Sequence, residues 1–152
     1  MYSRILVPID DSPTAQRGLD EGLALAQRLG ATLRLLYVVD ARLLVAELSA
    51  YFPADQLLKD SRAAGERLVF AAVERARSKA LAVDGVVRGD PTLHVCDVIV
   101  QEAKDWSAEL IVMGTHGRRG LRRIALGSDA QRVLLESPVP VLLVRDFAVS
   151  AT

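Results

Sequence analysis

The stretch 109-ELIVMGTHGRRGLRRIALGSD-129 decides the fold, because in it an apolar run passes directly into a glycine-rich basic segment. Residues 114–129 hold four glycines and four arginines. Glycine loses more conformational entropy on folding than any other residue, so several close together indicate a backbone that side chains would obstruct. The arginines indicate that this backbone approaches an anion. We therefore predict a buried strand that ends in an anion-binding loop.

The composition is that of one globular domain, and we expect it to span residues 1–152. Lys plus Arg and Asp plus Glu number 19 each, so no net charge draws the chain to nucleic acid or a membrane. The single cysteine, Cys96, excludes an internal disulfide and a multi-thiolate metal site. It also fits a reducing compartment. No window approaches the length of a membrane span, and the first apolar run is too short for a signal peptide, so we expect a cytoplasmic protein.

Five short apolar runs predict strands. They lie at residues 4–9, 32–39, 81–87, 109–114 and 139–144. The run at 81–87 is the weakest of these because Asp84 and Gly85 interrupt it. The other runs are mostly apolar and do not alternate with polar residues along their whole length, which is typical of parallel strands covered on both faces.

Helices are predicted between these strands. Ser12-Pro13 has the pattern of an N-cap followed by proline, and Gly30 ends that helix. Asp90-Pro91 repeats the cap-and-proline pattern, and the spacing of Ser128 and Gln131 predicts a capping box for the last helix. The helix after Asp90 carries Cys96, Ile99 and Ala103, and the apolar face of the long region before it is Leu57, Ala64, Leu68, Ala72 and Ala76.

Strands that alternate with helices predict an α/β fold, a doubly wound five-stranded parallel sheet with helices on both faces. Ligands of such sheets lie beyond the carboxyl ends of the strands, where the winding reverses. With the strand order 3-2-1-4-5, Asp10 and Gly114 end neighbouring strands at this point. The glycine-rich loop would then lie where this architecture binds ligands.

The glycines fit neither of two common phosphate-binding motifs. No Gly-Lys-Ser/Thr follows, as a P-loop requires, and the run follows the fourth strand rather than the first, unlike the dinucleotide fingerprint. However, Gly127-Ser128 opens a predicted helix, whose unpaired amides and positive dipole end favour phosphate. From the residues alone, the prediction stops at an anion, with phosphate favoured.

The spacing Gly114-x2-Gly117-x9-Gly127-Ser128 resembles the nucleotide-binding motif of the universal stress protein family, in its ATP-binding branch. The resemblance covers nearly the whole chain, from "ILVPIDDS" through "LLYVVD", "GDP" and "ELIVMGTHG" to "PVPVLLVRD". It implies a fold like that of adenine nucleotide hydrolases, with the order 3-2-1-4-5. It also implies an ATP-binding stress-response protein that acts as a nucleotide-dependent sensor or adaptor.

The resemblance implies a role for each position that matches the motif. Pro8 and Asp10 would line the adenosine pocket, with Asp10 accepting a hydrogen bond from the ribose, and Val38 and Met113 would contact the adenine. Gly114 and Gly117 would let the backbone approach the ribose and phosphates, and Gly127 and Ser128 would donate to the β- and γ-phosphates. Magnesium would accompany ATP without a dedicated carboxylate. We add His116 and Asp129, which lie within or beside this motif, to the candidate nucleotide-binding residues.

Some of these residues could have a different role. Asp129 departs from the family pattern, since an acid favours a helix N-terminus but repels a triphosphate. Arg118, Arg119, Arg122 and Arg123 form either a solvated loop or a grip on phosphate, and nucleic acid is a minor alternative.

Several single side chains also have two candidate roles. His116 has a loop role unless it is a catalytic base. The alternative role of Asp10 is to start a turn without contacting a ligand. The alternative role of Ser128 is to cap the helix without contacting a ligand. Tyr51 and Phe52 either pack or cover the adenine, and His94 lies at the surface.

The last strand predicts the assembly. The run 139–144 is an apolar edge strand, an aggregation liability that Pro140 reduces only in part. Pairing of Val139–Val144 with the same strand of a second copy would cover it, and the family resemblance also implies a homodimer. Two further functions stay open, a non-nucleotide interaction module and a weak adenine-nucleotide hydrolase with His116 as its base.

Overall fold

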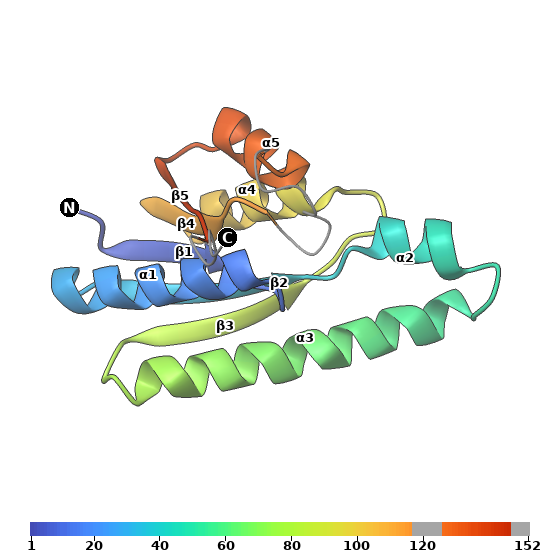
Figure 1. The fold of residues 1–152 in the computed structure, drawn as a ribbon, viewed down its shortest axis with the longest axis horizontal. Coiled ribbons are helices and arrows are strands. Elements are labelled where there is room, and N and C mark those ends of the chain that lie inside the picture. The colour runs from blue at the N-terminus through green and yellow to red at the C-terminus, as the bar shows by residue number, and fades with distance from the viewer. Residues whose placement is uncertain (117–125, 147–152) are drawn as a thin grey trace, which may run out of the picture.

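The computed structural model describes residues 1–116 and 126–146 as a parallel sheet between two layers of helices (Figure 1). The strand order is β3-β2-β1-β4-β5. The strands are β1 (Arg4–Pro8), β2 (Thr32–Val38), β3 (Val83–Arg88), β4 (Leu110–Gly114) and β5 (Val141–Val144). The predicted fold class and strand order are confirmed. Gly117 and the four loop arginines lie outside the described residues.

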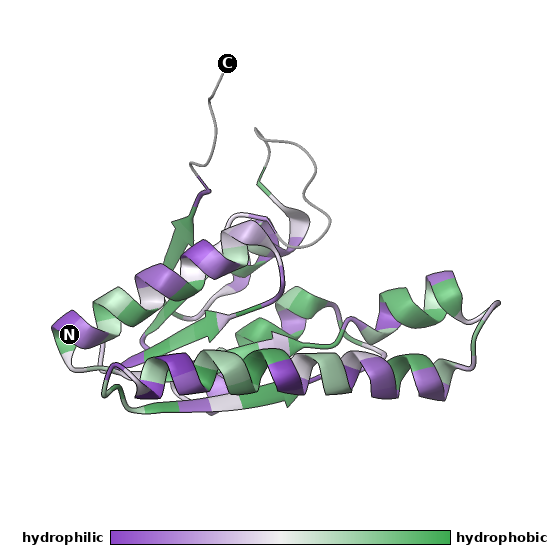
Figure 2. Ribbon diagram, turned by 60° about the horizontal axis from the view of Figure 1, so that its bottom comes forward, coloured by the Kyte–Doolittle hydropathy of each residue, from purple (hydrophilic) through white to green (hydrophobic). Residues whose placement is uncertain are grey.

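In the described residues, five helices accompany these strands, namely α1 (Pro13–Leu29), α2 (Ala41–Leu48), α3 (Ala54–Arg77), α4 (Val95–Asp105) and α5 (Ser128–Glu136). Helices α1 and α3 cover one face of the sheet, and α4 and α5 cover the other (Figure 1). Side chains alternate between the two cores, so Ile5 and Val7 pack on the α1 side while Leu6 packs on the α4 side. Figure 2 shows the resulting apolar strands and the helices that have one apolar and one polar side.

The start and end of α1 are as predicted. The Ser12 hydroxyl accepts a hydrogen bond from the Ala15 amide, and Pro13 occupies the first turn. Gly30 ends the helix at φ 64°, a left-handed conformation in which glycine avoids the strain of a side chain. These two caps set where α1 begins and where it ends.

The predicted start of the fourth helix is wrong. Helix α4 begins at Val95 with His94 as its N-cap, and Asp90-Pro91 forms a turn instead. The Asp90 carboxylate accepts hydrogen bonds from the amide and hydroxyl of Thr92, so it caps a turn rather than a helix. The same bonds lower the pKa of Asp90. His94 is exposed and Cys96 is buried, as predicted.

The long region before β3 also differs from the prediction. It is broken into α2 and α3, and the buried residues of α3 are Gly65, Val69, Ala72, Val73 and Ala76. Ala64, predicted on the apolar face, is exposed. Tyr51 is 80% exposed and Phe52 57% exposed, in the turn between the two helices, so of their two candidate roles packing is wrong and covering the adenine stays a prediction.

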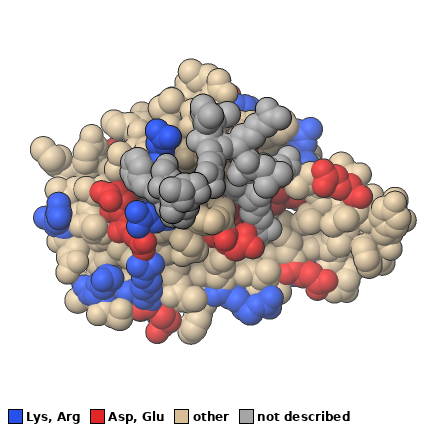
Figure 3. Space-filling model, viewed as in Figure 1, with Lys and Arg blue, Asp and Glu red and all other residues tan. Residues whose placement is uncertain are grey.

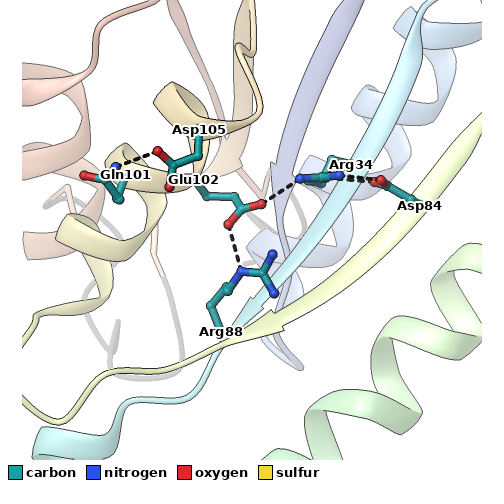
Figure 4. A network of polar contacts seen from close by, with 6 residues as sticks. All are labelled: Arg34, Asp84, Arg88, Gln101, Glu102 and Asp105. Carbon is teal, nitrogen blue, oxygen red and sulfur yellow. Dashed lines mark hydrogen bonds and ion pairs between the residues drawn. The ribbon is translucent and has the colours of Figure 1, made fainter.

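A polar network holds α4 on the sheet (Figure 4). Glu102 is only 5% exposed, and its carboxylate accepts hydrogen bonds from Arg34 at 2.9 Å and Arg88 at 3.0 Å. Arg34 also pairs with Asp84, which raises the pKa of its guanidinium, and it lies 4.9 Å from the ring centroid of Trp106. The network fixes the second half of α4 across β2 and β3, so the first turn of α4 is directed to the carboxyl ends of the strands.

The described helices are not membrane spans, because each is too short or too polar to cross a bilayer. Acidic and basic side chains are interspersed on the face drawn in Figure 3, in keeping with the zero formal net charge of the chain.

Candidate functional site

A cavity of about 300 Å³ lies at the carboxyl ends of β1, β2 and β4. This volume is at the lower end of the range for small-molecule sites. The wall includes nine residues that the sequence predicted for the site, namely Pro8, Asp10, Val38, Met113, Gly114, His116, Gly127, Ser128 and Asp129. Their contacts with a ligand stay predictions, but the fold brings them to one place.

Part of the cavity wall is apolar. We call Val38, Val95, Ile99 and Met113 the apolar end. Ile99 and Met113 are also core residues, so the same side chains hold the fold together and shape the cavity. The sequence did not predict Val95 or Ile99 as cavity residues, because the misplaced start of α4 hid their position in its first turns.

Helix α2 and its N-cap supply further wall residues that the sequence did not predict, namely Asp40, Leu43 and Leu44, with Ser61 from α3. The Asp40 carboxylate accepts a hydrogen bond from the Leu43 amide and so caps α2. An Asp directly after a strand and before an apolar pair was the available sequence signal for this short helix. Helix α2 therefore closes the side of the cavity next to β2.

Asp10 begins a turn and lines the cavity as well. Its Oδ1 accepts a hydrogen bond from the Ser12 amide at 2.7 Å, which leads the chain into α1. Among the described residues, its Oδ2 has no hydrogen-bond partner. The two predicted roles of Asp10 are therefore compatible, one oxygen for the turn and one facing a ligand.

His116 joins the start of the glycine-rich loop to α1. Its carbonyl accepts hydrogen bonds from the hydroxyls of Ser12 and Thr14, and its Nδ1 lies 3.0 Å from the Thr115 hydroxyl. The other end of the loop is held by the Gly127 amide, which donates to the Thr115 carbonyl at 2.8 Å. The backbone of His116 thus has a clear structural role, and a catalytic role for its imidazole stays a prediction.

One of the motif glycines is required by packing alone. A Cβ atom on Gly114 would lie 2.6 Å from the carbonyl carbon of Thr14, because α1 crosses β4 there. Gly114 would therefore be needed in this fold even without a ligand. A Cβ atom on Gly127 would lie 3.0 Å from the Thr115 carbonyl oxygen, a tight contact that does not by itself require glycine.

The predicted capping box at Ser128 is wrong. Helix α5 has Gly127 as its N-cap, and no side chain caps it. The Gln131 amide donates to the Gly127 carbonyl, which places Ser128 at the first helical position rather than at the cap. Ser128 is exposed and Asp129 is half-buried, and both line the cavity. We call Gly127, Ser128 and Asp129 the α5 end of the cavity.

The described wall of the cavity is acidic. It carries the carboxylates of Asp10, Asp40 and Asp129, and it includes no lysine or arginine within residues 1–116 and 126–146. The charge of Asp129 also acts on the thiol behind the wall. Burial, with help from Asp97 and Asp129, raises the pKa of Cys96 to about 11. Over the same described residues, no three His, Cys, Asp or Glu side chains gather as metal ligands would.

The comparison with known proteins identifies the family. The family model described as "Universal stress protein family" matches residues 1–145. The chain belongs to the universal stress protein family. A relative from Thermus aquaticus, the universal stress protein in the QAH/OAS sulfhydrylase 3' region, is 38% identical over 151 residues and is matched over 95% of this chain and all of its own length.

Solved structures of this family have the same fold. The universal stress protein MJ0577 of Methanocaldococcus jannaschii superimposes with a TM-score of 0.83 at 28% identity, covering 98% of this chain and 99% of its own. A universal stress protein in complex with cAMP has a TM-score of 0.67 at 23% identity, covering 95% and 97%. The Archaeoglobus fulgidus protein in complex with dAMP has a TM-score of 0.65 at 21% identity, covering 94% and 98%.

Proposed function

We propose that this chain is a cytoplasmic adenine-nucleotide-binding stress protein, one domain over residues 1–152, which binds ATP with magnesium and acts as a sensor or adaptor. The observation that carries the proposal is the cavity at the carboxyl ends of β1, β2 and β4. It combines an apolar end that suits a purine with the N-terminus of α5, whose amides suit a phosphate. Two universal stress proteins of this fold have been solved in complex with adenine nucleotides, one with cAMP and one with dAMP.

We propose that the cavity serves binding rather than rapid catalysis. Efficient phosphoryl transfer requires a fixed metal, a positioned base and a cation on the transferring group. The described residues form no cluster of three metal-ligating side chains. Magnesium would therefore arrive with the nucleotide and be held mainly by its phosphates and by water.

The test is a calorimetric titration of nucleotide-stripped protein with Mg-ATP, using two matched variants. Val95→Phe enlarges a half-buried side chain of the apolar end, and we expect it to abolish binding. Leu93→Phe makes a similar change two residues earlier, outside the cavity wall, and should leave the affinity as it is. Binding that survives Val95→Phe unchanged would contradict this location.

A non-nucleotide interaction module is the second candidate, and one observation favours it. Gly114 is needed for packing, so its presence does not require a nucleotide. Failure of AMP, ADP and Mg-ATP to bind under any condition would favour this second function.

We also propose that the chain forms a homodimer through Val139–Val144. The two sheet edges differ, since β3 carries the ion-paired Asp84 and Arg88 whereas β5 is apolar. Leu142 on β5 is 37% exposed, and Leu135 on the neighbouring α5 is 76% exposed. A charged edge resists pairing with another strand, whereas an apolar edge favours it.

Light scattering coupled to gel filtration tests the dimer. At micromolar concentration, light scattering should give twice the monomer mass for the unmodified chain. Leu142→Lys should give the monomer mass, because a charge on the edge strand opposes pairing. Phe70→Lys, at an exposed position of α3, is the control and should remain dimeric. The monomer mass for the unmodified chain would refute the proposal.

A further inference from the structure

Each helix that begins near the cavity already has a carboxylate at its N-terminus. Asp10 accepts a hydrogen bond from the Ser12 amide at the start of α1, and Asp40 caps α2. Asp97 accepts from the His94 amide at the start of α4, and Asp129 lies in the first turn of α5. The positive end of a helix amounts to about half a unit charge, so one carboxylate more than offsets it.

Asp129 differs from the other three carboxylates. Asp10, Asp40 and Asp97 each accept a hydrogen bond from a backbone amide. These hydrogen bonds stabilise the starts of α1, α2 and α4. Asp129 makes no hydrogen bond to a residue of the described chain, yet it is half-buried in the cavity wall. Its charge reaches the buried Cys96 thiol, where it helps to raise the pKa. Arg132 on the same helix acts on this thiol in the opposite sense, but its ion pairs are with Asp97 and Glu136. Within residues 1–116 and 126–146, Asp129 therefore forms no ion pair.

We propose that Asp129 sets the ligand preference of this cavity by opposing phosphate charge that no divalent cation neutralises. This inference rests on the proposed function, nucleotide binding in the cavity, and adds a rule for which nucleotides bind. A phosphate at the N-terminus of α5 would meet the amides there and the Asp129 carboxylate at the same time. The repulsion grows with the number of phosphates, because like charges a few ångströms apart in a partly buried site interact strongly.

The rule separates three ligands. AMP, with the shortest phosphate chain, keeps most of its charge away from the α5 end and binds with or without a cation. Metal-free ATP brings the most unneutralised charge and binds weakly. Mg-ATP recovers affinity because the cation bound to the phosphates offsets their charge before it meets Asp129.

The experiment is a set of calorimetric titrations of stripped protein with AMP, ADP and ATP in a chelator, and with ATP in excess magnesium. We expect the affinity in chelator to fall from AMP to ADP to ATP, and magnesium to raise the affinity for ATP at least tenfold. Asp129→Asn removes the charge at nearly constant size, and it should raise the metal-free ATP affinity about tenfold, or about 1.4 kcal/mol. The affinity for AMP should change less than twofold.

Glu136→Gln is the matched control, because it removes one negative charge at the other end of α5, away from the cavity wall. An equal gain in ATP affinity with Glu136→Gln would reduce the effect to net charge and overturn the proposal. No gain with Asp129→Asn, while AMP and ATP both bind, would also overturn it. Failure of all three nucleotides to bind any of the proteins would instead refute the proposed function.

Discussion

The two ends of the cavity are built differently. At the apolar end, Ile99 and Met113 are buried core residues, so the sheet and α4 fix their positions. At the α5 end, Ser128 is exposed and no side chain caps the helix. A substitution at the apolar end should therefore alter folding and binding together, whereas one at the α5 end should alter ligand preference with little effect on folding.

The greatest loss is expected at the apolar end. Ile99→Ala removes a buried side chain that also lines the cavity, and it should lower the free energy of unfolding by about 3 kcal/mol. It should lower the affinities for AMP and for ATP by the same factor, roughly tenfold, because both nucleotides contain the adenosine that this end would contact. Urea denaturation and calorimetry measure the two quantities.

The control for this prediction is Val133→Ala. Val133 is fully buried in the same core but does not line the cavity, so this variant should lose stability and keep its nucleotide affinity. A loss of ATP affinity without a loss of AMP affinity in Ile99→Ala would contradict the division of the cavity into two ends.

A more modest change is expected at the α5 end. Ser128→Ala should change the free energy of unfolding by less than about 0.5 kcal/mol, because Ser128 makes no cap hydrogen bond. Its hydroxyl would donate to the phosphates, so Mg-ATP affinity should fall about fivefold, as expected for one hydrogen bond. AMP affinity should be nearly unchanged. A loss of about 1 kcal/mol in stability would mean that Ser128 caps the helix after all.

The weakest effect concerns Cys96, behind the α5 end. Its pKa is raised to about 11 from the ordinary 9.0, so the folded thiol keeps its proton longer than the unfolded thiol as pH rises. Stability is therefore unaffected below pH 9 and falls as pH rises from 9 to 11. At pH 8 the folded thiol should react with a disulfide reagent far more slowly than in urea.

The same reaction also reports on Asp129. Asp129→Asn should lower the pKa of Cys96 by removing a negative charge. Glu136→Gln should change this pKa less, because Glu136 is connected to the thiol only through its ion pair with Arg132. Labelling of the folded protein at the unfolded rate would contradict the burial of this thiol.

Much of the fold could be predicted because its signals are local. Apolar runs identified all five strands, even β3 with its interruption at Asp84 and Gly85, and the Ser12-Pro13 cap and Gly30 set the ends of α1. The errors arose where one signal serves two structures. Asp90-Pro91 caps a turn with the same chemistry that caps a helix, and Ser128 follows a glycine that takes the cap position.

The candidate site was predictable where residues end strands, as Asp10 and Gly114 do. It was not predictable where helices approach from elsewhere in the chain, as Leu43 and Ile99 do. The interpretation of the glycines also changed, because only the structure shows that α1 presses against Gly114. The spacing of the glycines does not predict a close approach between two backbone segments that are far apart in sequence.

The most direct test of nucleotide binding in this cavity is a crystal structure of the protein with Mg-ATP. We expect the adenine between Val38 and Met113 at the apolar end and the phosphates at the N-terminus of α5, beside Gly127 and Ser128. A nucleotide bound away from the carboxyl ends of β1, β2 and β4, or with its base at the α5 end, would contradict the proposed function.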